Sequence, residues 1–349
     1  MSPAPCLRSL FSLVRVRWLG VAVAAGIAAV AALLAAWPPV ARAGLSAMTL
    51  AIGLGICAGN AQPALATGRA AEGVDFARGA LLRAGVVLYG FRISFQDIGA
   101  VGWPGLLISV AVVAMVFGAA VFLGTRWLGL DRETSMLIGA GSAICGAAAV
   151  MATQPVIRSE ERKVSIAVAT VVVFGTLAMV AYPLAYPHLG LSEHAFGLFA
   201  GSTVHEVAQV VAVGEAVGGA AARAAVVEKM LRVMLLAPFL VLLSARAASA
   251  GPGRNGPLWR RVRVPWFAFA FIGASALHSL RVVPPPLVAA LVWLGTLVLA
   301  TAMAAMGLRT SLGSLRMAGL QPLKLAGLLF LLLTVGGYGV NRVVLWWLA

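Results

Sequence analysis

Residues 104–124 read PGLLISVAVVAMVFGAAVFLG, and this uncharged stretch decides what kind of protein the chain forms. A helix of about 20 apolar residues spans the roughly 30 Å hydrocarbon core of a bilayer. Similar runs recur from Trp18 to the C-terminus. Of the 349 residues, 61% are hydrophobic and 11% are charged, whereas about 25% are charged in a typical soluble domain. The sequence therefore predicts an all-α polytopic membrane protein.

The apolar runs and the polar residues between them predict about 9–11 membrane segments in a single membrane transport domain, residues 1–349. The expected segments are 18–37, 44–63, 80–96, 104–124, 134–157, 165–186, 195–216, 231–248, 265–281, 286–307 and 325–347. We expect a first half, 44–186, and a second half, 195–349. Residues 1–43 form either a signal-like segment, with Ala41-Arg42-Ala43 as a cleavage site, or a first membrane helix, which the length of the run favours.

The basic residues indicate the orientation of these segments. The formal net charge is +15, but the Lys and Arg residues lie in short loops, so we expect membrane topology signals and no nucleic-acid binding. More of the 26 basic residues lie on the cytoplasmic side if 134–157 and 195–216 are re-entrant or broken than if every segment crosses. The N-terminus and the basic loop 249–264 are then cytoplasmic, and Lys229 and Arg232 lie on the external side.

Segment 134–157 has the composition of an interrupted helix. Ser142, Cys145 and Gly146 lie there among further glycines at membrane depth. Dense glycines let the backbone leave the helix and direct N–H groups into a cavity, or they let neighbouring helices pack closely. Both interpretations stay open at this stage.

Segment 195–216 carries a polar stripe. Ser202, His205, Glu206 and Gln209 are spaced as i, i+3, i+4 and i+7, which is one face of a continuous helix. A charged carboxylate at mid-bilayer costs about 2.5–3.5 kcal/mol, so it needs a wet cavity or a partner. We expect a transport site in which His205 or Glu206 titrates or binds a coupling ion. The alternative is a contact of Glu206 with His205 or an arginine that only joins two helices.

Two further stretches resemble each other. Gly90-Phe91-Arg92-Ile93-Ser94 and Gly307-Leu308-Arg309-Thr310-Ser311 both end an apolar segment, and Gly102 and Gly319 keep the same offset. The two copies end segments that run in opposite directions in the expected topology, as in the inverted repeats of transporters. We therefore predict inverted-repeat pseudo-symmetry. The two arginines could hold an anion or extend to lipid headgroups.

Motifs for catalysis and metal binding are weak. His205-Glu206 begins like the HExxH zinc motif, but position 209 is Gln, so we expect no metal. We expect no catalytic residues, no cofactor and no enzymatic activity. An intramembrane enzyme with Cys145 and His205 as its reactive pair is one alternative, and an ion channel or a non-transporting sensor subunit is another.

Four motifs resemble a known family. They are LLRAGVVLYGFRISFQDI at 81–98, LIGAGSAICGAAAVMAT at 137–153, GSTVHEVAQVVAVG at 201–214 and KMLRVMLLAPFL at 229–240. Together they closely resemble the YeiH-like family of bacterial inner-membrane proteins, for which sulfate export is the suggested activity. This resemblance implies a multi-pass secondary transporter in the bacterial plasma membrane, with sulfate or a related oxyanion as its cargo. A homo-oligomer is compatible with it.

The binding site that we expect combines residues from both interrupted segments and from the two matched helix ends. Its members are Ser142, Cys145, Gly146, Ser202, Thr203, His205, Gln209, Arg92 and Arg309, with His205 and Glu206 as coupling residues. Serine and threonine hydroxyls, arginines and helix N-termini are suitable donors for an anion.

Overall fold

The computed structural model describes residues 4–37, 40, 47–65, 67–248, 266–310 and 319–348. This part of the chain is helical and has no β-strand, which confirms the all-α prediction. The chain divides into two compact units. The first unit comprises Met1–Arg92 and Gly273–Leu312, and the second comprises Ile93–Ile272 and Gly313–Ala349. The predicted cleavage site at 41–43 and the basic loop 249–264 lie outside the described residues.

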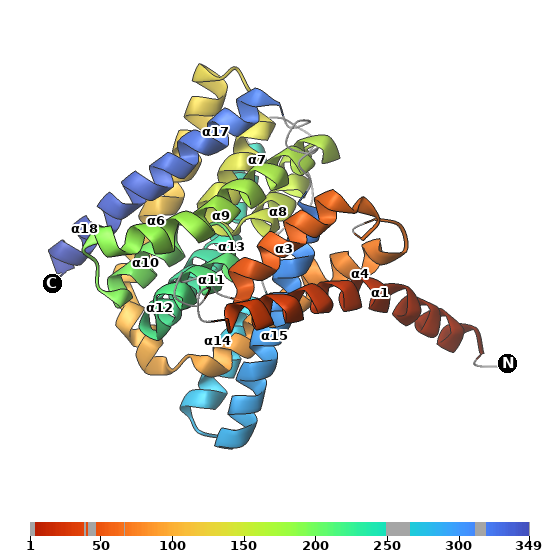
Figure 1. The fold of residues 1–349 in the computed structure, drawn as a ribbon. Coiled ribbons are helices and arrows are strands. Elements are labelled where there is room, and N and C mark those ends of the chain that lie inside the picture. Colours follow the sequence, from red (N-terminus) through yellow and green to blue (C-terminus); the bar gives the residue numbers. More distant parts are fainter. Residues whose placement is uncertain are drawn as a thin grey trace. The chain divides into compact units, whose positions relative to one another are not determined.

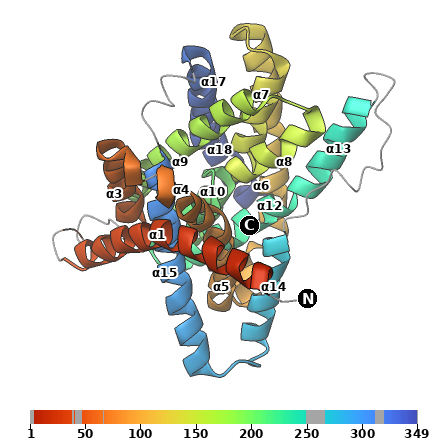
Figure 2. The same ribbon diagram turned by 90° about the vertical axis from the view of Figure 1, so that its right-hand side faces the viewer.

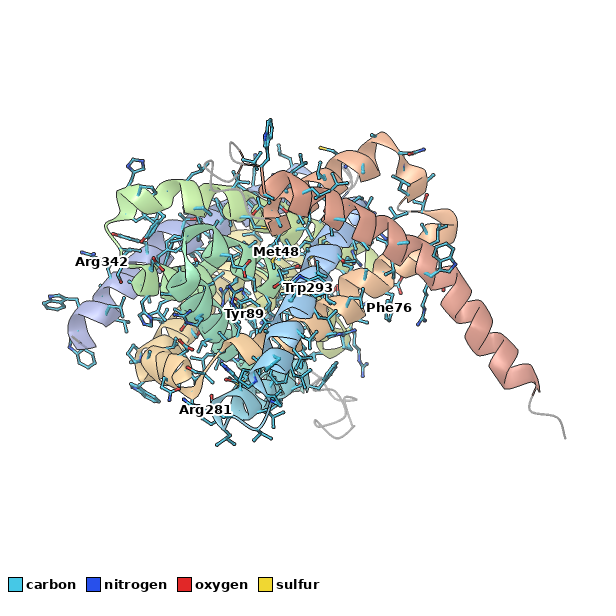
Figure 3. The ribbon with its side chains drawn as sticks, turned by 60° about the horizontal axis from the view of Figure 1, so that its bottom comes forward. Met48, Phe76, Tyr89, Arg281, Trp293 and Arg342 are labelled. Atoms are coloured by element: carbon cyan, nitrogen blue, oxygen red, sulfur yellow. The ribbon has the colours of Figure 1, made fainter. Side chains whose placement is uncertain are left out.

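The first unit is built around the pairing of two apolar helices (Figure 1). Its helices are α1 (Ala4–Ala35), α3 (Ala47–Ala61), α4 (Ala71–Phe76), α5 (Leu82–Tyr89) and α15 (Pro285–Arg309); α14 (Trp266–Ser279) runs across the boundary between the units. A Cβ atom on Gly55 of α3 would lie 2.4 Å from the carbonyl oxygen of Ala304, so glycine is required where α3 and α15 meet. Figure 3 labels Met48 and Tyr89, which are buried in this unit, and Trp293, which is exposed.

The second unit contains the remaining helices, several of which are short pieces of an interrupted span (Figures 1 and 2). They are α6 (Phe95–Phe122), α7 (Arg132–Ala140), α8 (Ala147–Ile157), α9 (Glu161–Leu189), α10 (Glu193–Thr203), α11 (Val207–Val217), α12 (Gly219–Met234), α13 (Leu236–Ala248), α17 (Leu320–Leu331) and α18 (Gly337–Leu348). Helix α12 packs against α10, α11 and α6, and α9 packs against α11. Most residues of α12 are buried, so this helix lies at the centre of the unit.

Five helices in the described residues are long and apolar enough to cross a membrane. They cover Arg17–Ala35, Phe95–Trp127, Glu161–Leu189, Pro285–Arg309 and Leu320–Trp347. Large apolar side chains lie on their outer faces; Trp346, for example, is 81% exposed. A surface of this kind suits lipid and not water.

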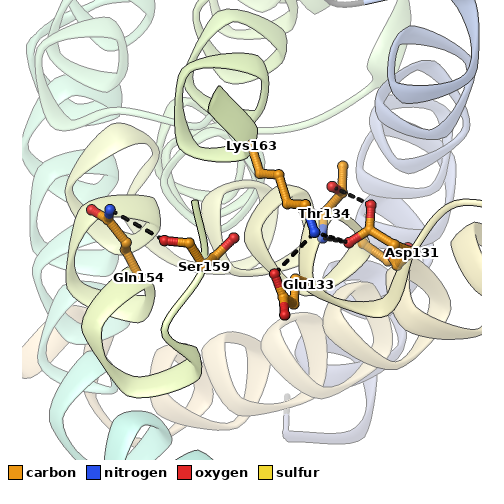
Figure 4. A network of polar contacts seen from close by, with 7 residues as sticks. Asp131, Glu133, Thr134, Gln154, Ser159 and Lys163 are labelled. Carbon is orange, nitrogen blue, oxygen red and sulfur yellow. Dashed lines mark hydrogen bonds and ion pairs between the residues drawn. The ribbon is translucent and has the colours of Figure 1, made fainter. Parts of the chain in front are cut away.

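Helix α7 begins with a strong cap. The Asp131 carboxylate accepts hydrogen bonds from the Thr134 amide at 3.0 Å and from the Thr134 hydroxyl at 2.7 Å. Lys163 of α9 forms ion pairs with Asp131 at 3.1 Å and with Glu133 at 3.0 Å (Figure 4). Burial by itself raises the pKa of the Asp131 carboxyl, but the Thr134 donors and the Lys163 ammonium outweigh it, so its pKa lies below the ordinary 3.8. The network therefore joins the start of α7 to α9.

The two matched stretches of sequence share one local feature. Gly102 has φ +43° and Gly319 has φ +81°, both in the region of backbone space that favours glycine. Gly102 forms a kink inside α6, and Gly319 precedes α17. The inverted-repeat relation itself stays a prediction.

Candidate functional site

Both segments predicted to be interrupted are broken helices. Helix α7 continues as a π-helical turn, Gly141–Cys145, and stops at Gly146, which has φ +71° and ψ −137°; α8 starts at the next residue. Helix α10 stops at Thr203, and the backbone is extended at Val204 and Glu206 before α11 begins. Whether each segment returns to the side from which it entered stays a prediction.

The carbonyl ends of the two breaks converge on two buried cations of α12. Lys229 Nζ donates hydrogen bonds to the carbonyl oxygens of Ile144 at 2.8 Å and Val204 at 2.7 Å. Each of these bonds reaches a different broken helix, so Lys229 joins the two breaks. The last turn of a helix leaves carbonyl groups without an intrahelical partner, and it carries about half a negative charge. The buried Lys229 ammonium donates hydrogen bonds to such carbonyl groups and offsets their partial negative charge.

Arg232, one helical turn after Lys229, also binds carbonyl groups of both breaks; we call this region, where the two broken helices meet α12, the junction. Its Nε donates to the Ala143 carbonyl at 2.6 Å, and one terminal nitrogen donates to the Ser142 carbonyl at 2.6 Å. The other terminal nitrogen donates to the carbonyl of Ser202 on α10. The side chains of Lys229 and Arg232 are fully buried. These two cations therefore hold the carbonyl ends of both breaks together.

The amide ends of the breaks meet at the carboxylate of Glu206. Its Oε1 accepts a hydrogen bond from the Ala147 amide at the start of α8, at 3.3 Å. Its own amide donates to Gln209 Oε1 at 3.1 Å, within the first turn of α11. A Cβ on Gly146 would lie 2.4 Å from Glu206 Cγ, so glycine provides the room for this side chain. A carboxylate is stabilised at helix N-termini because the dipole is positive there.

The predicted polar stripe is corrected by this geometry. Ser202 lies in the last turn of α10, His205 and Glu206 lie in the break, and Gln209 lies on α11, so the four residues do not share one continuous helical face. The break still brings them into one buried region. Among the described residues, His205 Nδ1 and Gln209 Nε2 are buried polar atoms without a hydrogen-bond partner.

The remaining predicted residues of the broken segments are also buried in the second unit. Ser142, Cys145, Ser202 and Thr203 line the breaks. Asn341 of α18 donates to Ser202 Oγ at 3.0 Å, and the Thr203 hydroxyl donates to the Phe199 carbonyl at 2.6 Å. Their role in binding stays a prediction.

The two predicted arginines belong to the first unit. The Arg92 guanidinium lies 5.5 Å from the centre of the Tyr89 ring, and Arg309 forms an ion pair with Asp75. Each therefore has a partner of its own within that unit. Their participation in an anion site stays a prediction.

The interpretation of Lys229 and Arg232 as external topology signals is wrong. Both lie on α12, which begins at Gly219, whereas the sequence placed the next membrane segment at 231–248. Glu228, Lys229 and Arg232 lie at i, i+1 and i+4 in a stretch whose other residues are apolar, and this spacing was the signal that could have revealed a buried charged helix face. Among the described residues, no group of three His, Cys, Asp or Glu side chains could hold a metal ion.

Comparison with known proteins adds the following similarities. Residues 19–326 match the sequence model of the family described as conserved hypothetical protein 698. The chain is 49% identical over 327 residues to the UPF0324 inner membrane protein YeiH of Escherichia coli K12, covering 93% of each chain. It is 50% identical over 312 residues to a UPF0324 membrane protein of Yersinia pestis, covering 86% of this chain and 85% of the relative. A UPF0324 membrane protein of Pseudomonas aeruginosa is 49% identical over 334 residues.

Proposed function

We propose that this chain, which belongs to the family described as conserved hypothetical protein 698, is a secondary transporter that carries a small anion across the bacterial inner membrane. The cargo that we propose is sulfate or a related oxyanion, driven by a proton or sodium gradient. The relatives from Escherichia coli and Salmonella are named inner membrane proteins, and the long apolar helices suit that location. The transport activity and the cargo are our proposal.

The observation that supports this proposal is the junction of the two broken helices. Non-helical backbone at membrane depth is tolerated only where protein or a water-filled cavity surrounds it. Ionisable side chains inside a membrane domain are costly and mark pathways for ions or substrates. Transporters place their sites at the ends of discontinuous helices for these reasons. Here two breaks, two buried cations and two buried carboxylates occupy one region.

The chemistry of the junction suits an anion. Lys229 and Arg232 are cations, α8 and α11 begin there with their positive dipole ends, and His205 and Gln209 have polar nitrogens without partners in the described residues. The carboxyl group of Glu206 already accepts a hydrogen bond from the start of α8. A small oxyanion beside it would use the remaining donors.

Purified protein in proteoliposomes tests this proposal against a panel of labelled oxyanions, with and without proton and sodium gradients. We expect saturable flux that a gradient drives. A steady conductance that needs no gradient would identify a channel instead.

The site is tested by His205→Ala and Glu206→Gln in the same assay. We expect both to reduce transport, whereas Glu193→Gln, a change at an exposed carboxylate, serves as the control. Unchanged transport and unchanged pH dependence in both variants would show that the site lies elsewhere.

A further inference from the structure

A second buried acid lies next to the two cations. The Glu228 side chain of α12 has no exposed surface. Its Oε1 accepts a hydrogen bond from the Ser109 hydroxyl of α6 at 2.7 Å, and its Oε2 has no hydrogen-bond partner among the described residues. A Cβ on Gly105 of α6 would lie 2.3 Å from Oε2. Glycine on the facing helix therefore makes the room for this carboxyl.

The neighbouring cations do not pair with Glu228. Lys229 and Arg232 donate their hydrogen bonds to carbonyl groups of the two breaks, and the ion pairs of the described residues do not include Glu228. A buried carboxylate with one neutral donor lacks the partners that ionisation requires. A protonated carboxyl needs fewer partners, because one of its oxygens becomes a donor.

The other surroundings of Glu228 carry no further charge. Helix α6 faces it with Gly105 and Ser109, and α10 faces it with Gly201, whose added Cβ would lie 2.7 Å from Glu228 Cβ. Glu206, before α11, accepts its hydrogen bond from the Ala147 amide of α8 instead. Lys229 and Arg232, on its own helix, are therefore the charged groups that act on Glu228.

The two buried acids differ in their environments. Glu206 lies at the N-termini of α8 and α11 and accepts a hydrogen bond from the Ala147 amide. These dipoles stabilise its negative charge. Glu228 lies in the middle of α12, where the helix dipole offers no such stabilisation. Of the two acids, Glu228 is the one whose environment suits a neutral carboxyl that exchanges a proton.

We infer that Glu228 is the proton-carrying residue of this protein and that a proton and the transported anion bind together, an inference that rests on the proposed transport function. When Glu228 is ionised, the positive charges of Lys229 and Arg232 equal the negative charges of Glu206 and Glu228. When Glu228 binds a proton, the junction gains a net positive charge. A buried net charge attracts a counter-ion strongly because the surroundings have a low dielectric constant. The anion and the proton therefore favour each other's binding, and both move in the same direction.

The first experiment measures anion binding and exchange in purified protein as a function of pH. With one proton bound per anion, the wild-type dissociation constant for sulfate should rise about tenfold per pH unit above the pH at which Glu228 ionises. Glu228→Gln mimics the neutral acid, so its affinity should not depend on pH in this range. It should still exchange sulfate across the bilayer but should not accumulate it with a pH gradient. Glu193→Gln should behave like the wild type.

Two results decide the inference. If Glu228→Gln keeps the wild-type pH dependence and gradient-driven accumulation, the inference is wrong. If Glu228→Gln does not fold, Ser109→Ala replaces it, because loss of the hydroxyl donor should move the midpoint of the pH dependence; an unmoved midpoint contradicts the assignment.

A second measurement does not depend on transport. Infrared difference spectra between low and high pH should contain the carbonyl band of a protonated carboxyl in the wild type that is missing in Glu228→Gln. If the wild type carries none of the oxyanions but shows this band, the proposed function fails while the proton site stands. If both spectra are the same, Glu228 carries no exchangeable proton.

Discussion

Replacing Arg232 by methionine should destabilise the protein strongly, because this change removes a cation that holds both breaks. Methionine replaces the apolar stem of the arginine side chain, so the contacts of that stem with the residues around α12 are largely kept. What is lost is three hydrogen bonds to the carbonyls of Ser142, Ala143 and Ser202. Water cannot easily replace them, because the Arg232 side chain is fully buried.

The magnitude follows from these partners. A hydrogen bond to a charged group contributes about 1.5–3 kcal/mol, and a buried acceptor left without a partner costs about 1–3 kcal/mol. Removing one partner from a buried charged network typically costs about 3–5 kcal/mol. Lys229 remains hydrogen-bonded to the neighbouring carbonyls of Ile144 and Val204. We therefore expect the free energy of unfolding to fall by about 3–5 kcal/mol, which is less than the sum of the three separate hydrogen bonds.

Unfolding in mixed detergent micelles, followed by circular dichroism, measures this loss. Arg223→Met is a matched control on the same helix. The Arg223 side chain is 40% exposed and forms one ion pair with Asp97 at 2.9 Å, so its loss should cost about 1 kcal/mol or less. If Arg232→Met is as stable as Arg223→Met, the buried cations do not hold the breaks together and the reasoning fails.

Three other changes test separate parts of the structure. Gly146→Ala should cost about 1–3 kcal/mol in the same unfolding assay, because φ is +71° and the new Cβ would meet Glu206; Gly118→Ala, where open space surrounds the glycine, should not destabilise the protein. Asp131→Ala should cost about 1 kcal/mol at neutral pH by removing the acceptor that caps α7. The pKa of the Asp131 carboxyl is lowered by folding, so this stabilisation is present above the ordinary 3.8 and is lost as the pH falls through the folded value; equal stability losses at acid and neutral pH would contradict the assignment. A reporter fused after residue 256 should lie in the cytoplasm, and a periplasmic signal would overturn the predicted orientation.

The sequence was informative about features of the fold that depend on neighbouring residues alone, such as membrane helices. Apolar runs of about 20 residues identify membrane helices because the bilayer thickness is nearly constant. The glycines around Gly146 were compatible with a broken helix or with close helix packing, and the structure has positive φ at Gly146, which a residue without a Cβ adopts readily. The break between Thr203 and Val207 had a weaker signal, because its residues also fit a continuous polar stripe.

The residues of α12 could not be placed in the same way. Lys229 and Arg232 resemble the basic residues of an external loop when charge and hydropathy are read along the chain. Their true partners are carbonyl groups at Ser142, Ile144 and Val204, which are 25 to 90 residues away. The backbone donates and accepts hydrogen bonds in every residue, so the sequence contains no mark for a carbonyl that a broken helix leaves unpaired.

The sequence by itself determined that this chain is a helical membrane protein, and it indicated where glycines could interrupt a helix, because hydropathy and backbone freedom are properties of neighbouring residues. The tertiary structure alone decided that two cations join the carbonyl ends of the two breaks, and that Glu228 lies buried without a hydrogen bond to a cation among the described residues. These features depend on which distant groups come together. In a low-dielectric interior, that proximity decides whether a charge is stabilised.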